Sequence, residues 1–421
     1  MCVYSYSMVD YIKSYFESNK ETLERELTKL TVSWGTDCDE QKKDDELATL
    51  KQSYKTAAIH LLPDKTNDTL YYCNFYLDEW FRKSVETVYN LHLRRGQLES
   101  NMNHLKRLEL PEQRSKEWYE IRETLLTASS LADALGKGHF KTRDALLLDK
   151  TSVSDKKDTI SKMSRDIMQW GVKYEPVATE FYEHLYGVKI IEFGLIPHPE
   201  LSVFGASPDG ICDIGSPNGY TGRMLEIKCP PKRKFTHEVP LHYWMQMQGQ
   251  LEVCDLDECD FFQVKLEEYS SVAEYEKDQL CKDRLLHGKT SNDLPKGLLI
   301  AYMKKKSDTI EYKYSPWLAP LDEIITWRDQ TLQELCDEYT IYEMRWWRIE
   351  RYECTLVRRD KSWWLSIVPD IIQFWKDVVH YREGGNEEIQ KKIDGRKRGP
   401  RKKVFEISEP LKGYLMDSDE D

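Results

Sequence analysis

Three ionisable residues stand close together on a predicted β-hairpin. Asp209 ends one apolar run, and Glu226 and Lys228 lie on the next, across the turn-rich segment GSPNGYTG. Side chains two apart on a strand share a face, and a hairpin through this turn brings Asp209 beside the other two. Mg²⁺ prefers a few carboxylates together with water and phosphate oxygens. A lysine there can orient or help deprotonate a water and offset charge on a phosphate. The segment therefore predicts a magnesium and phosphate site.

The alternative interpretation is an exposed hairpin with an ordinary Glu–Lys pair, which contributes little. E-x-K spacing alone is a weak signal, but a preceding PDG at hairpin distance and flanking apolar strand residues strengthen it. A third acid, Glu175, lies one helix upstream in QWGVKYEPVATEFYEHLYG, where a helix that crosses the sheet can aim it at the same metal. Glu180 and Glu183 of that helix are interpreted as solvated positions.

The elements that must position these residues follow from hydrophobic periodicity. Residues 164–187 predict a long amphipathic helix that Gly187 ends, and short strands follow in VKIIEFGLIP, SVFGASPDGICDI and RMLEIKCP. Residues 239–254 predict a helix, and residues 261–266, 298–303 and 309–314 predict strands. Residues 316–383 look helical and hold seven of the twelve Trp. The pattern is that of a helix feeding a sheet, with more helices after it.

Five motifs occur in order over residues 115–255: EWYEIRETLLTASSLADALG, WGVKYEPVA, SPDG, LEIKCP and HYWMQMQGQL. Together they resemble the YqaJ-type viral recombinase family, the phage lambda exonuclease-like branch of the PD-(D/E)xK nucleases. The resemblance implies an α/β (α+β) fold: a restriction-endonuclease-like core with a central mixed sheet flanked by helices, plus helical N-terminal and C-terminal additions. Additions of this length are similar to those in versions from large eukaryotic DNA viruses.

The resemblance also implies roles for matching residues. The metal ligands it implies are Glu175, Asp209, Glu226 and the backbone carbonyl of Ile227, with Lys228 as catalytic lysine and Gln246 as an active-site glutamine. The cofactor it implies is Mg²⁺ or Mn²⁺, with two ions per site.

A second group matches residues that engage a DNA 5′-phosphate. Arg122 matches the phosphate-binding arginine, Thr127, Ser129 and Ser207 its smaller hydrogen-bonding partners, and Trp118 a packing position. An arginine fork with small hydroxyls suits a terminal phosphate. Each also has an ordinary alternative: Arg122 on a helix surface, Thr127 and Ser129 as helix caps, and Gln246 in solvent. Gln248 and Gln250 are left out of the predicted site.

The charge distribution is uneven. There are 61 Lys and Arg against 73 Asp and Glu, a net charge of −12, whereas binding to DNA phosphates rests on basic residues. Those residues concentrate at 137–157, 228–234 and 391–403. We expect the first stretch, with Lys232, Arg233 and Lys234 directly after the catalytic strand, to line a DNA groove. The run GRKRGPRKK is a nuclear-localisation signal, a DNA-contacting arm or a solvated tail.

Composition limits the class of protein. Forty per cent hydrophobic residues exclude disorder throughout, and ten scattered Cys without a CxxC pair argue against a zinc ribbon, a disulfide framework or an iron–sulfur cluster. Apolar runs are too short to span a bilayer, and the N-terminus lacks a signal peptide's pattern. We expect a soluble intracellular protein of the host nucleus or a cytoplasmic viral factory.

Four parts are expected along the chain: a helical region of unknown role at 1–108, the nuclease core at 109–350, a Trp-rich helical extension at 351–390 and a charged flexible tail at 391–421. Residues 267–296 look like an insertion. These additions leave open whether the phage enzyme's trimeric ring carries over or a monomer encloses the DNA.

The leading hypothesis is a metal-dependent 5′→3′ exonuclease that digests one strand of linear double-stranded DNA. The 3′ single strands would serve viral recombination, replication or genome processing. Its partners would be duplex DNA with a 5′-phosphate end and a viral single-strand-binding or annealing protein, with no membrane. A structure-selective endonuclease with the same metal site and an inactive DNA-binding or scaffold protein are the alternatives.

Overall fold

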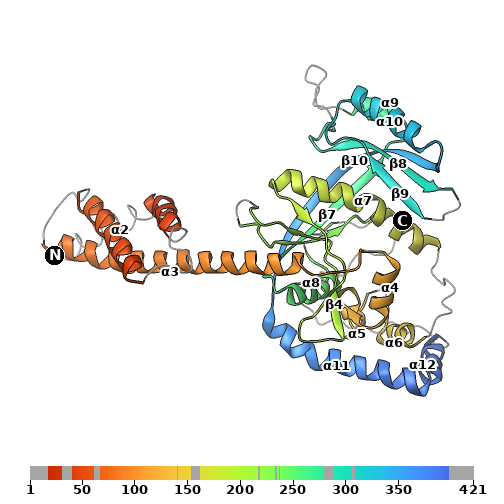
Figure 1. Cartoon of the computed structure of the whole chain (residues 1–421), viewed down its shortest axis with the longest axis horizontal. Helices are drawn as coiled ribbons and strands as arrows, with labels where there is room; N and C mark the ends of the chain where they lie inside the picture. Colours follow the sequence, from red (N-terminus) through yellow and green to blue (C-terminus); the bar gives the residue numbers. More distant parts are fainter. Residues whose placement is uncertain are drawn as a thin grey trace, which may run out of the picture. The chain divides into compact units, whose positions relative to one another are not determined.

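The computed structural model divides the chain into two compact units. One comprises residues 1–108 and 213–222, and the other comprises residues 109–212 and 223–421. The structure describes residues 18–30, 40–60, 67–139, 141–152, 162–216, 219–232, 235–236, 238–278, 288–305 and 309–397. Figure 1 shows the arrangement and labels many of the helices and strands. None of the described helices is long and apolar enough to cross a membrane. The four-part division expected from the sequence stays a prediction.

The first unit is helical up to Lys106 wherever it is described. A helix covers residues 18–30, and two longer helices follow, α2 (Glu40–His60) and α3 (Asn67–Lys106). Leu23 and Leu27, one turn apart, are buried against Phe81 of α3 and the apolar side of α2, because residues four apart share a helix face. Lys106 pairs with Asp213 of the hairpin turn. The helical N-terminal addition expected from the sequence is confirmed over these residues.

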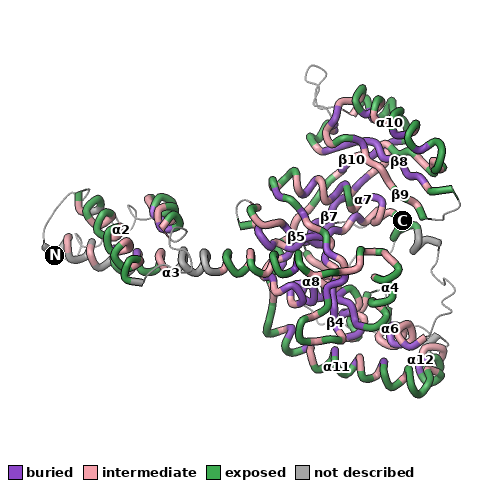
Figure 2. The backbone as a smooth tube through the Cα atoms, in the orientation of Figure 1, coloured by how far each residue is buried: buried purple, intermediate pink, exposed green. Residues whose placement is uncertain are grey.

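The second unit is built on a mixed sheet, which confirms the expected α/β class. Among the described residues, seven strands form this sheet in the order β2-β5-β6-β7-β10-β8-β9. Their bounds are β2 (Ile190–Ile191), β5 (Gly210–Cys212), β6 (Met224–Lys228), β7 (Glu258–Glu268), β10 (Tyr339–Arg358), β8 (Lys296–Lys304) and β9 (Ile310–Tyr314). β5 and β6 are antiparallel neighbours, as the hairpin interpretation predicts, and β6 runs parallel to β7. Figure 2 shows that buried residues concentrate around β4, β5 and β7.

Two helices cover opposite faces of the central strands. Consecutive residues on a strand point to opposite faces, so Phe261 and Phe262 of β7 identify the two sides. Phe262 packs against Phe181 of α7 (Lys162–Tyr186), with ring centroids 6.0 Å apart. Phe261 packs against Tyr243 of α8 (Leu241–Cys254), at 5.5 Å. Because Glu226 is in register with Phe261 across the parallel pair, its side chain faces α8.

The region expected to be helical over residues 316–383 is partly a strand, so that prediction is wrong in its middle. α10 (Leu321–Leu335) and α11 (Lys361–Gly384) are helices, but the twenty residues of β10 lie between them. β10 pairs with β7 along one part and with β8 along the other, with register shifts at Ile349/Arg351 and Ile341/Glu343. The expected helical extension at 351–390 therefore begins with a strand. The expected strand at 309–314 is confirmed as β9.

A small second sheet and several helices complete this unit. Its strand order is β1-β4-β3, with bounds β1 (Leu126–Thr127), β4 (Phe204–Ala206) and β3 (Ile196–Pro197). The remaining described helices are α4 (Lys116–Glu123), α5 (Leu131–Ala134), α6 (Arg143–Thr151), α9 (Val272–Lys277) and α12 (Glu387–Lys397), with a 3₁₀ turn, η1, at Ala128–Ser130. Gly249 of α8 lies so close to this sheet that a Cβ there would be 2.9 Å from the ring of Phe204. The small sheet is thereby tied to the helix that faces Glu226.

Candidate active site

Glu226 is fully buried, and its carboxylate is held by hydrogen bonds on both oxygens. Oε1 accepts from Nε2 of Gln246 at 2.7 Å and from the ammonium of Lys228, and Oε2 accepts from Nε2 of Gln250 at 2.8 Å. Gln246 and Gln250 are four residues apart on α8 and therefore point to the same side. A buried carboxylate is costly unless it is paired and hydrogen-bonded. The three donors offset that cost and fix the position of Glu226.

Asp209 lies directly before β5, opposite the strand that carries Glu226. Its Oδ2 accepts from the backbone N–H of Ile227 at 2.7 Å and is 4.0 Å from Nζ of Lys228. Burial raises the pKa of Asp209 well above its ordinary value, and the negative charge of Glu226 raises this pKa further, whereas Lys228 lowers it. The hairpin therefore brings Asp209, Glu226 and Lys228 together as the sequence predicts.

Lys228 forms ion pairs with both Glu226 and Asp209. Its Nζ donates to Glu226 and lies 5.1 Å from the ring centroid of Tyr243. Burial by itself lowers the pKa of Lys228, but the charges of Glu226 and Asp209 outweigh it, so the pKa lies above its ordinary value. The ammonium therefore stays charged at neutral pH, which favours a role in orienting groups and offsetting charge over one in removing a proton.

Glu175 reaches the same region from α7 and has a partner that the sequence analysis missed. Its two carboxylate oxygens lie 3.3 and 3.2 Å from Nη2 of Arg114. Burial raises the pKa of Glu175, Arg114 and Lys228 lower it, and the charge of Glu226 raises it. Pro176 follows inside the helix and removes one backbone hydrogen bond there. No motif pointed to Arg114; the only signal was its place in EQRS, just before the first motif.

The donor chemistry of these residues fits a divalent cation. Within the described parts of the chain, no three His, Cys, Asp or Glu side chains are grouped so that they could hold a metal ion. Mg²⁺, however, needs only one or two carboxylates, with waters and substrate oxygens completing its shell. Only Oδ2 of Asp209 accepts a hydrogen bond among the described residues, which leaves Oδ1 available. The full ligand set with Glu175, Glu226 and the carbonyl of Ile227 stays a prediction.

A second cluster lies around the end of α4. The guanidinium of Arg122 lies over the ring of Trp118, 4.2 Å from its centroid, and its Nη2 donates to Oγ of Ser129 at 3.3 Å. The Thr127 and Ser129 hydroxyl oxygens are 3.1 Å apart. Nε1 of Trp118 donates to Oγ of Ser207 at 3.1 Å. All five residues predicted from the sequence for this group are therefore in one place.

The ordinary alternatives for this cluster do not describe it. Arg122 is half-buried, and burial lowers the pKa of its guanidinium, so it is not a solvated surface arginine. Thr127 occupies the N-cap position of the 3₁₀ turn but makes no capping hydrogen bond. Its hydroxyl instead contacts Ser129 and Ser130. The cluster thus presents a guanidinium and small hydroxyls together, which is the chemistry that suits a phosphate.

Two basic side chains hold the C-terminal end of α4 in place. Lys150 of α6 donates to the backbone oxygen of Leu125 at 2.9 Å, and Arg382 of α11 donates to that of Glu123 at 2.8 Å. At the other end, Ser115 caps α4 by accepting from the N–H of Trp118 at 3.1 Å. α11, part of the C-terminal addition, therefore supports the turn that carries Arg122.

Ser207 joins the two clusters. Its hydroxyl accepts from Trp118, while its backbone oxygen accepts from Nε2 of Gln250 at 3.3 Å. Gln250 in turn donates to Glu226, and Asp209 follows Ser207 by two residues. The Arg122 cluster and the carboxylates are thus connected through the hydroxyl and the backbone oxygen of Ser207.

Two glutamines left out of the predicted site have different outcomes. Gln250 is buried and binds Glu226, so leaving it out was wrong; its position four residues after Gln246 was the available signal. Gln248 is also buried, but its amide donates to the backbone oxygen of Arg358 and accepts from the N–H of Asp360. Its exclusion from the site agrees with these contacts.

The predicted DNA groove is only partly described. Lys232 is exposed, while Arg233, Lys234 and residues 153–157 lie outside the described residues. Within 137–152, three cations bind their own fold. Lys141 pairs with Asp149 and Arg143 with Asp377, and Lys150 binds backbone oxygens. That stretch therefore has fewer cations available for DNA than its composition indicates.

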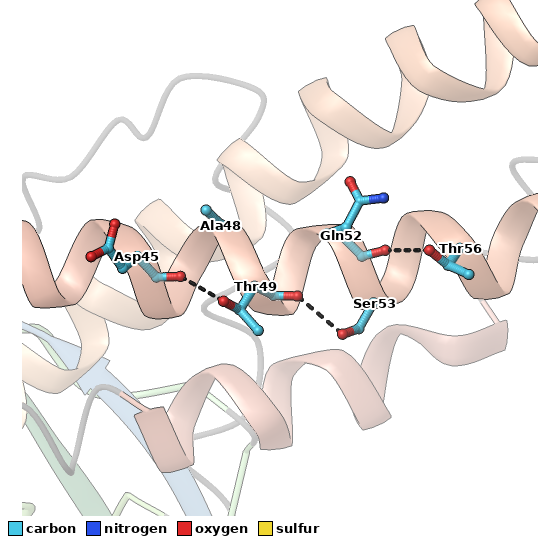
Figure 3. A pocket seen from close by; sticks show the side chains of 6 residues that line it. All are labelled: Asp45, Ala48, Thr49, Gln52, Ser53 and Thr56. Atoms are coloured by element: carbon cyan, nitrogen blue, oxygen red, sulfur yellow. Dashed lines mark hydrogen bonds between the residues drawn. The ribbon is translucent and has the colours of Figure 1, made fainter.

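A separate hollow lies in the first unit. One side of α2 lines it, with Asp45, Ala48, Thr49, Gln52, Ser53 and Thr56 (Figure 3). The hydroxyls of Thr49, Ser53 and Thr56 donate to backbone oxygens four residues earlier in the same helix. These contacts are local to one helix, and the hollow shares no residue with the carboxylates or with the Arg122 cluster.

Comparisons with known proteins agree with the motifs. The chain is 32% identical over 308 residues to an uncharacterized protein of Acanthamoeba polyphaga mimivirus. This match covers 66% of this chain and 54% of that protein. It is 28% identical over 167 residues to a protein of African swine fever virus, with 34% and 46% covered. The chain thus spans about half the length of these curated relatives.

Among solved structures, the alkaline exonuclease LHK-Exo of Laribacter hongkongensis is similar, with a TM-score of 0.35 and 20% identity. The match covers 67% of this chain and all of that one. A family model, the YqaJ-like viral recombinase domain, matches residues 117–257, a range that holds both clusters apart from Arg114. The segment that carries both clusters is thus similar in sequence to that family.

Proposed function

We propose that this protein is a divalent-metal-dependent DNA exonuclease. It would hydrolyse one strand of linear double-stranded DNA from a 5′-phosphate end and leave a 3′ single strand for viral recombination, replication or genome processing. The support is the YqaJ-like viral recombinase domain together with two adjacent clusters, one of carboxylates with a lysine and one of an arginine with small hydroxyls.

The observation that carries the proposal is the position of Ser207. Its hydroxyl accepts a hydrogen bond from Trp118 and its backbone oxygen accepts one from Gln250, and these bonds connect the Arg122 cluster to the residue that holds Glu226. A terminal phosphate bound by Arg122 would therefore place the next phosphodiester bonds of the same strand near Asp209. A site for a chain end beside a hydrolytic site is the arrangement that an exonuclease needs, because productive positioning accounts for much of catalysis.

The chain's own groups have separable roles in phosphodiester hydrolysis. Gln246 and Gln250 hold Glu226, and the N–H of Ile227 holds Asp209, so both carboxylates are fixed before substrate binds. The charged ammonium of Lys228 would offset negative charge that develops on the attacked phosphate and orient the attacking water. Arg122 with Thr127 and Ser129 would bind the terminal phosphate.

A divalent cation, Mg²⁺ or Mn²⁺, would be held by Asp209, Glu226, Glu175 and the carbonyl of Ile227. It would supply Lewis acidity and a more acidic water. Glu226 can take part only if one of its present donors yields, because both of its oxygens already accept hydrogen bonds.

The test is digestion of linear duplexes labelled at either end, with and without a 5′-phosphate, beside a circular control. The wild-type protein should release the 5′ label first and prefer phosphorylated ends. Arg122→Ala should lose that preference, so that the two linear substrates are cut at similar rates. The control is Lys116→Ala, an exposed residue of the same helix that pairs with Glu120, and it should keep the preference.

Other outcomes would point elsewhere. Cleavage of the circle would identify an endonuclease with the same metal site. DNA binding without cleavage in either metal would identify a binding protein. An equal loss on both ends in Arg122→Ala would mean that Arg122 serves folding or general backbone contact rather than the terminal phosphate.

A further inference from the structure

Arg114 has a backbone conformation that side-chain-bearing residues seldom adopt. Its φ is +68°, in the left-handed region that favours glycine and costs free energy for other residues. Strained positions of this kind persist only where the surrounding structure fixes them, and they cluster at functional sites. The question is therefore what holds the turn and what the side chain does there.

The turn is fixed on both sides of Arg114. Nε2 of Gln113 donates to the backbone oxygens of Phe193, at 2.8 Å, and of Pro208, at 3.2 Å. Ser115 caps α4, which carries Trp118 and Arg122. The segment also packs closely against Gly194, where a Cβ would lie 2.0 Å from the backbone oxygen of Pro111. The backbone of Arg114 is thus set between the residue before Asp209 and the helix that carries Arg122.

The side chain is held much less firmly than the backbone. One nitrogen, Nη2, contacts both oxygens of Glu175, and the guanidinium makes no other hydrogen bond among the described residues. The side chains of Arg114 and Glu175 are 45% and 32% exposed, and ion pairs this exposed contribute little. Arginine normally binds oxyanions through two parallel N–H groups, so this pair leaves most of its donors unused.

We propose that Arg114 is a further phosphate-binding residue of the cleavage site, whose guanidinium leaves Glu175 for a DNA phosphate when a divalent cation binds. This inference rests on the proposed function. A cation held at Glu175 would repel the guanidinium and compete with it for the same oxygens. The nearest new anion would be a phosphate of the bound strand, and the fixed turn keeps Arg114 beside both Asp209 and the Arg122 helix. Arg114 and Arg122 would then hold two phosphates of the strand being digested.

The test uses the full chain and two measurements that do not depend on turnover. Mn²⁺ binding is measured without DNA by electron paramagnetic resonance of the free ion. DNA binding is measured by fluorescence anisotropy over a range of salt concentrations, with a duplex that phosphorothioate linkages protect from cleavage. Arg114→Gly removes the guanidinium and suits the positive φ, so it should fold at least as well as the wild type. Arg114→Lys keeps the charge, and Lys116→Ala is the matched loss of one charge two residues away.

Arg114→Gly should bind Mn²⁺ roughly threefold to tenfold more tightly than the wild type, because a competing cation is gone. The same variant should bind DNA more weakly, with a slope of log affinity against log salt reduced by about one. Arg114→Lys should recover most of the slope, and Lys116→Ala should change neither quantity. These results together would support the exchange.

Unchanged or weaker Mn²⁺ binding by Arg114→Gly would overturn it, as would unchanged DNA binding. Failure of the proposed function would look different. A wild-type protein that neither binds Mn²⁺ nor digests the labelled duplex would refute both ideas. A wild-type protein that does both, while Arg114→Gly matches it in both measurements, would refute only the role of Arg114.

Discussion

Two buried clusters of charge lie near β6 and β7, on opposite faces of the sheet, and differ in how completely their charges are paired. In the first, Asp209 and Glu226 share one cation, Lys228. In the second, Arg223 lies between two carboxylates, with Nη1 3.0 Å from Oδ1 of Asp260 and Nη2 bonded to Glu258. The hydroxyl of Tyr182 also donates to Asp260, at 2.7 Å.

The two clusters differ in what remains unsatisfied. Asp260 is 3% exposed, and both of its oxygens accept hydrogen bonds. Its negative charge is therefore neutralised by residues of the fold itself. Among the residues that the structure describes, no donor binds Oδ1 of Asp209, and the pKa of Asp209 is raised by burial and by Glu226. A buried carboxylate whose two oxygens both accept hydrogen bonds has a structural role. Two carboxylates that share a single lysine carry excess negative charge, which favours binding of a metal cation. The number of carboxylates alone does not distinguish the clusters.

The largest effect should come from Asp209→Asn, which should reduce cleavage of linear duplex DNA roughly 1,000-fold or more. The metal-free variant should unfold at the same denaturant concentration as the wild type or at a higher one, because one of two carboxylates that share Lys228 loses its charge. Cleavage rates and urea unfolding without metal check both parts. A clear loss of stability would mean that the fold already neutralises the charge of Asp209, as it does that of Asp260.

Asp260→Asn should give the reverse pattern. Asn keeps one acceptor oxygen but replaces the other with an NH₂ donor, so either Arg223 or Tyr182 loses its buried acceptor. Removal of one partner of a buried ion pair costs about 3–5 kcal/mol. We expect the low end of that range, because Glu258 still pairs with Arg223. Urea unfolding measures the loss, and the cleavage rate per folded molecule should stay within about threefold of the wild type. A catalytic loss as large as that of Asp209→Asn would mean that the Asp260 cluster is not purely structural.

The two glutamines of α8 sharpen the same comparison with smaller effects. Gln250→Met should lower cleavage per folded molecule by about 10-fold to 100-fold, because the residues that orient ligands affect activity by such factors. It should also cost about 1–3 kcal/mol of stability, because it removes a donor from the buried carboxylate of Glu226. Gln248→Met should cost about 1–3 kcal/mol of stability, since it removes the side-chain partner of two part-buried backbone groups, the carbonyl of Arg358 and the N–H of Asp360. It should leave cleavage per folded molecule unchanged. If Gln248→Met lowered cleavage per folded molecule and Gln250→Met did not, Gln248 rather than Gln250 would belong to the site.

The smallest effect concerns a buried cation without a carboxylate. Nζ of Lys296 donates to the backbone oxygens of Tyr275 and Asp278, both at 2.6 Å. Burial lowers the pKa of Lys296 to about 8 from 10.5, with Asp278 opposing the shift. Between these values the unfolded chain binds the proton that the folded chain has released, so stability rises with pH in that window. The wild type should gain about 1–3 kcal/mol relative to Lys296→Met between pH 8 and 10.5 in urea unfolding. A constant difference would contradict this.

The local part of the site could be predicted from the sequence. Asp209, Glu226 and Lys228 lie on one hairpin, so turn spacing and strand periodicity predicted that they lie together. The Arg122 group draws Ser207 from a second motif and was predicted from the family resemblance. Arg114 and Gln250 were missed because their roles depend on contacts between elements: Arg114 with α7, and Gln250 with β6. Helical spacing allowed Gln250 but could not choose between it and a solvated position.

β10 was mistaken for helix for a physical reason. Two register shifts interrupt its alternation, and each shift moves the side chains that follow to the other face. Its apolar residues, among them Trp346, Trp347 and Ile349, therefore fall at uneven intervals that look helical. Long-range pairing, rather than local propensity, decides the structure of this segment.

The place of β10 in the sheet also sets an order of events during synthesis. β7 pairs with β6 on one edge and with β10 on the other, and roughly 80 residues of chain separate Glu268 from its partner Trp347. While the ribosome makes that stretch, the strands that carry Glu226 and Asp260 exist beside an open edge, and unpaired edges invite pairing with other chains. The nascent chain therefore passes through an interval of exposure that ends only when β10 has emerged. Slower translation across residues 269–338 should lengthen it and increase aggregation.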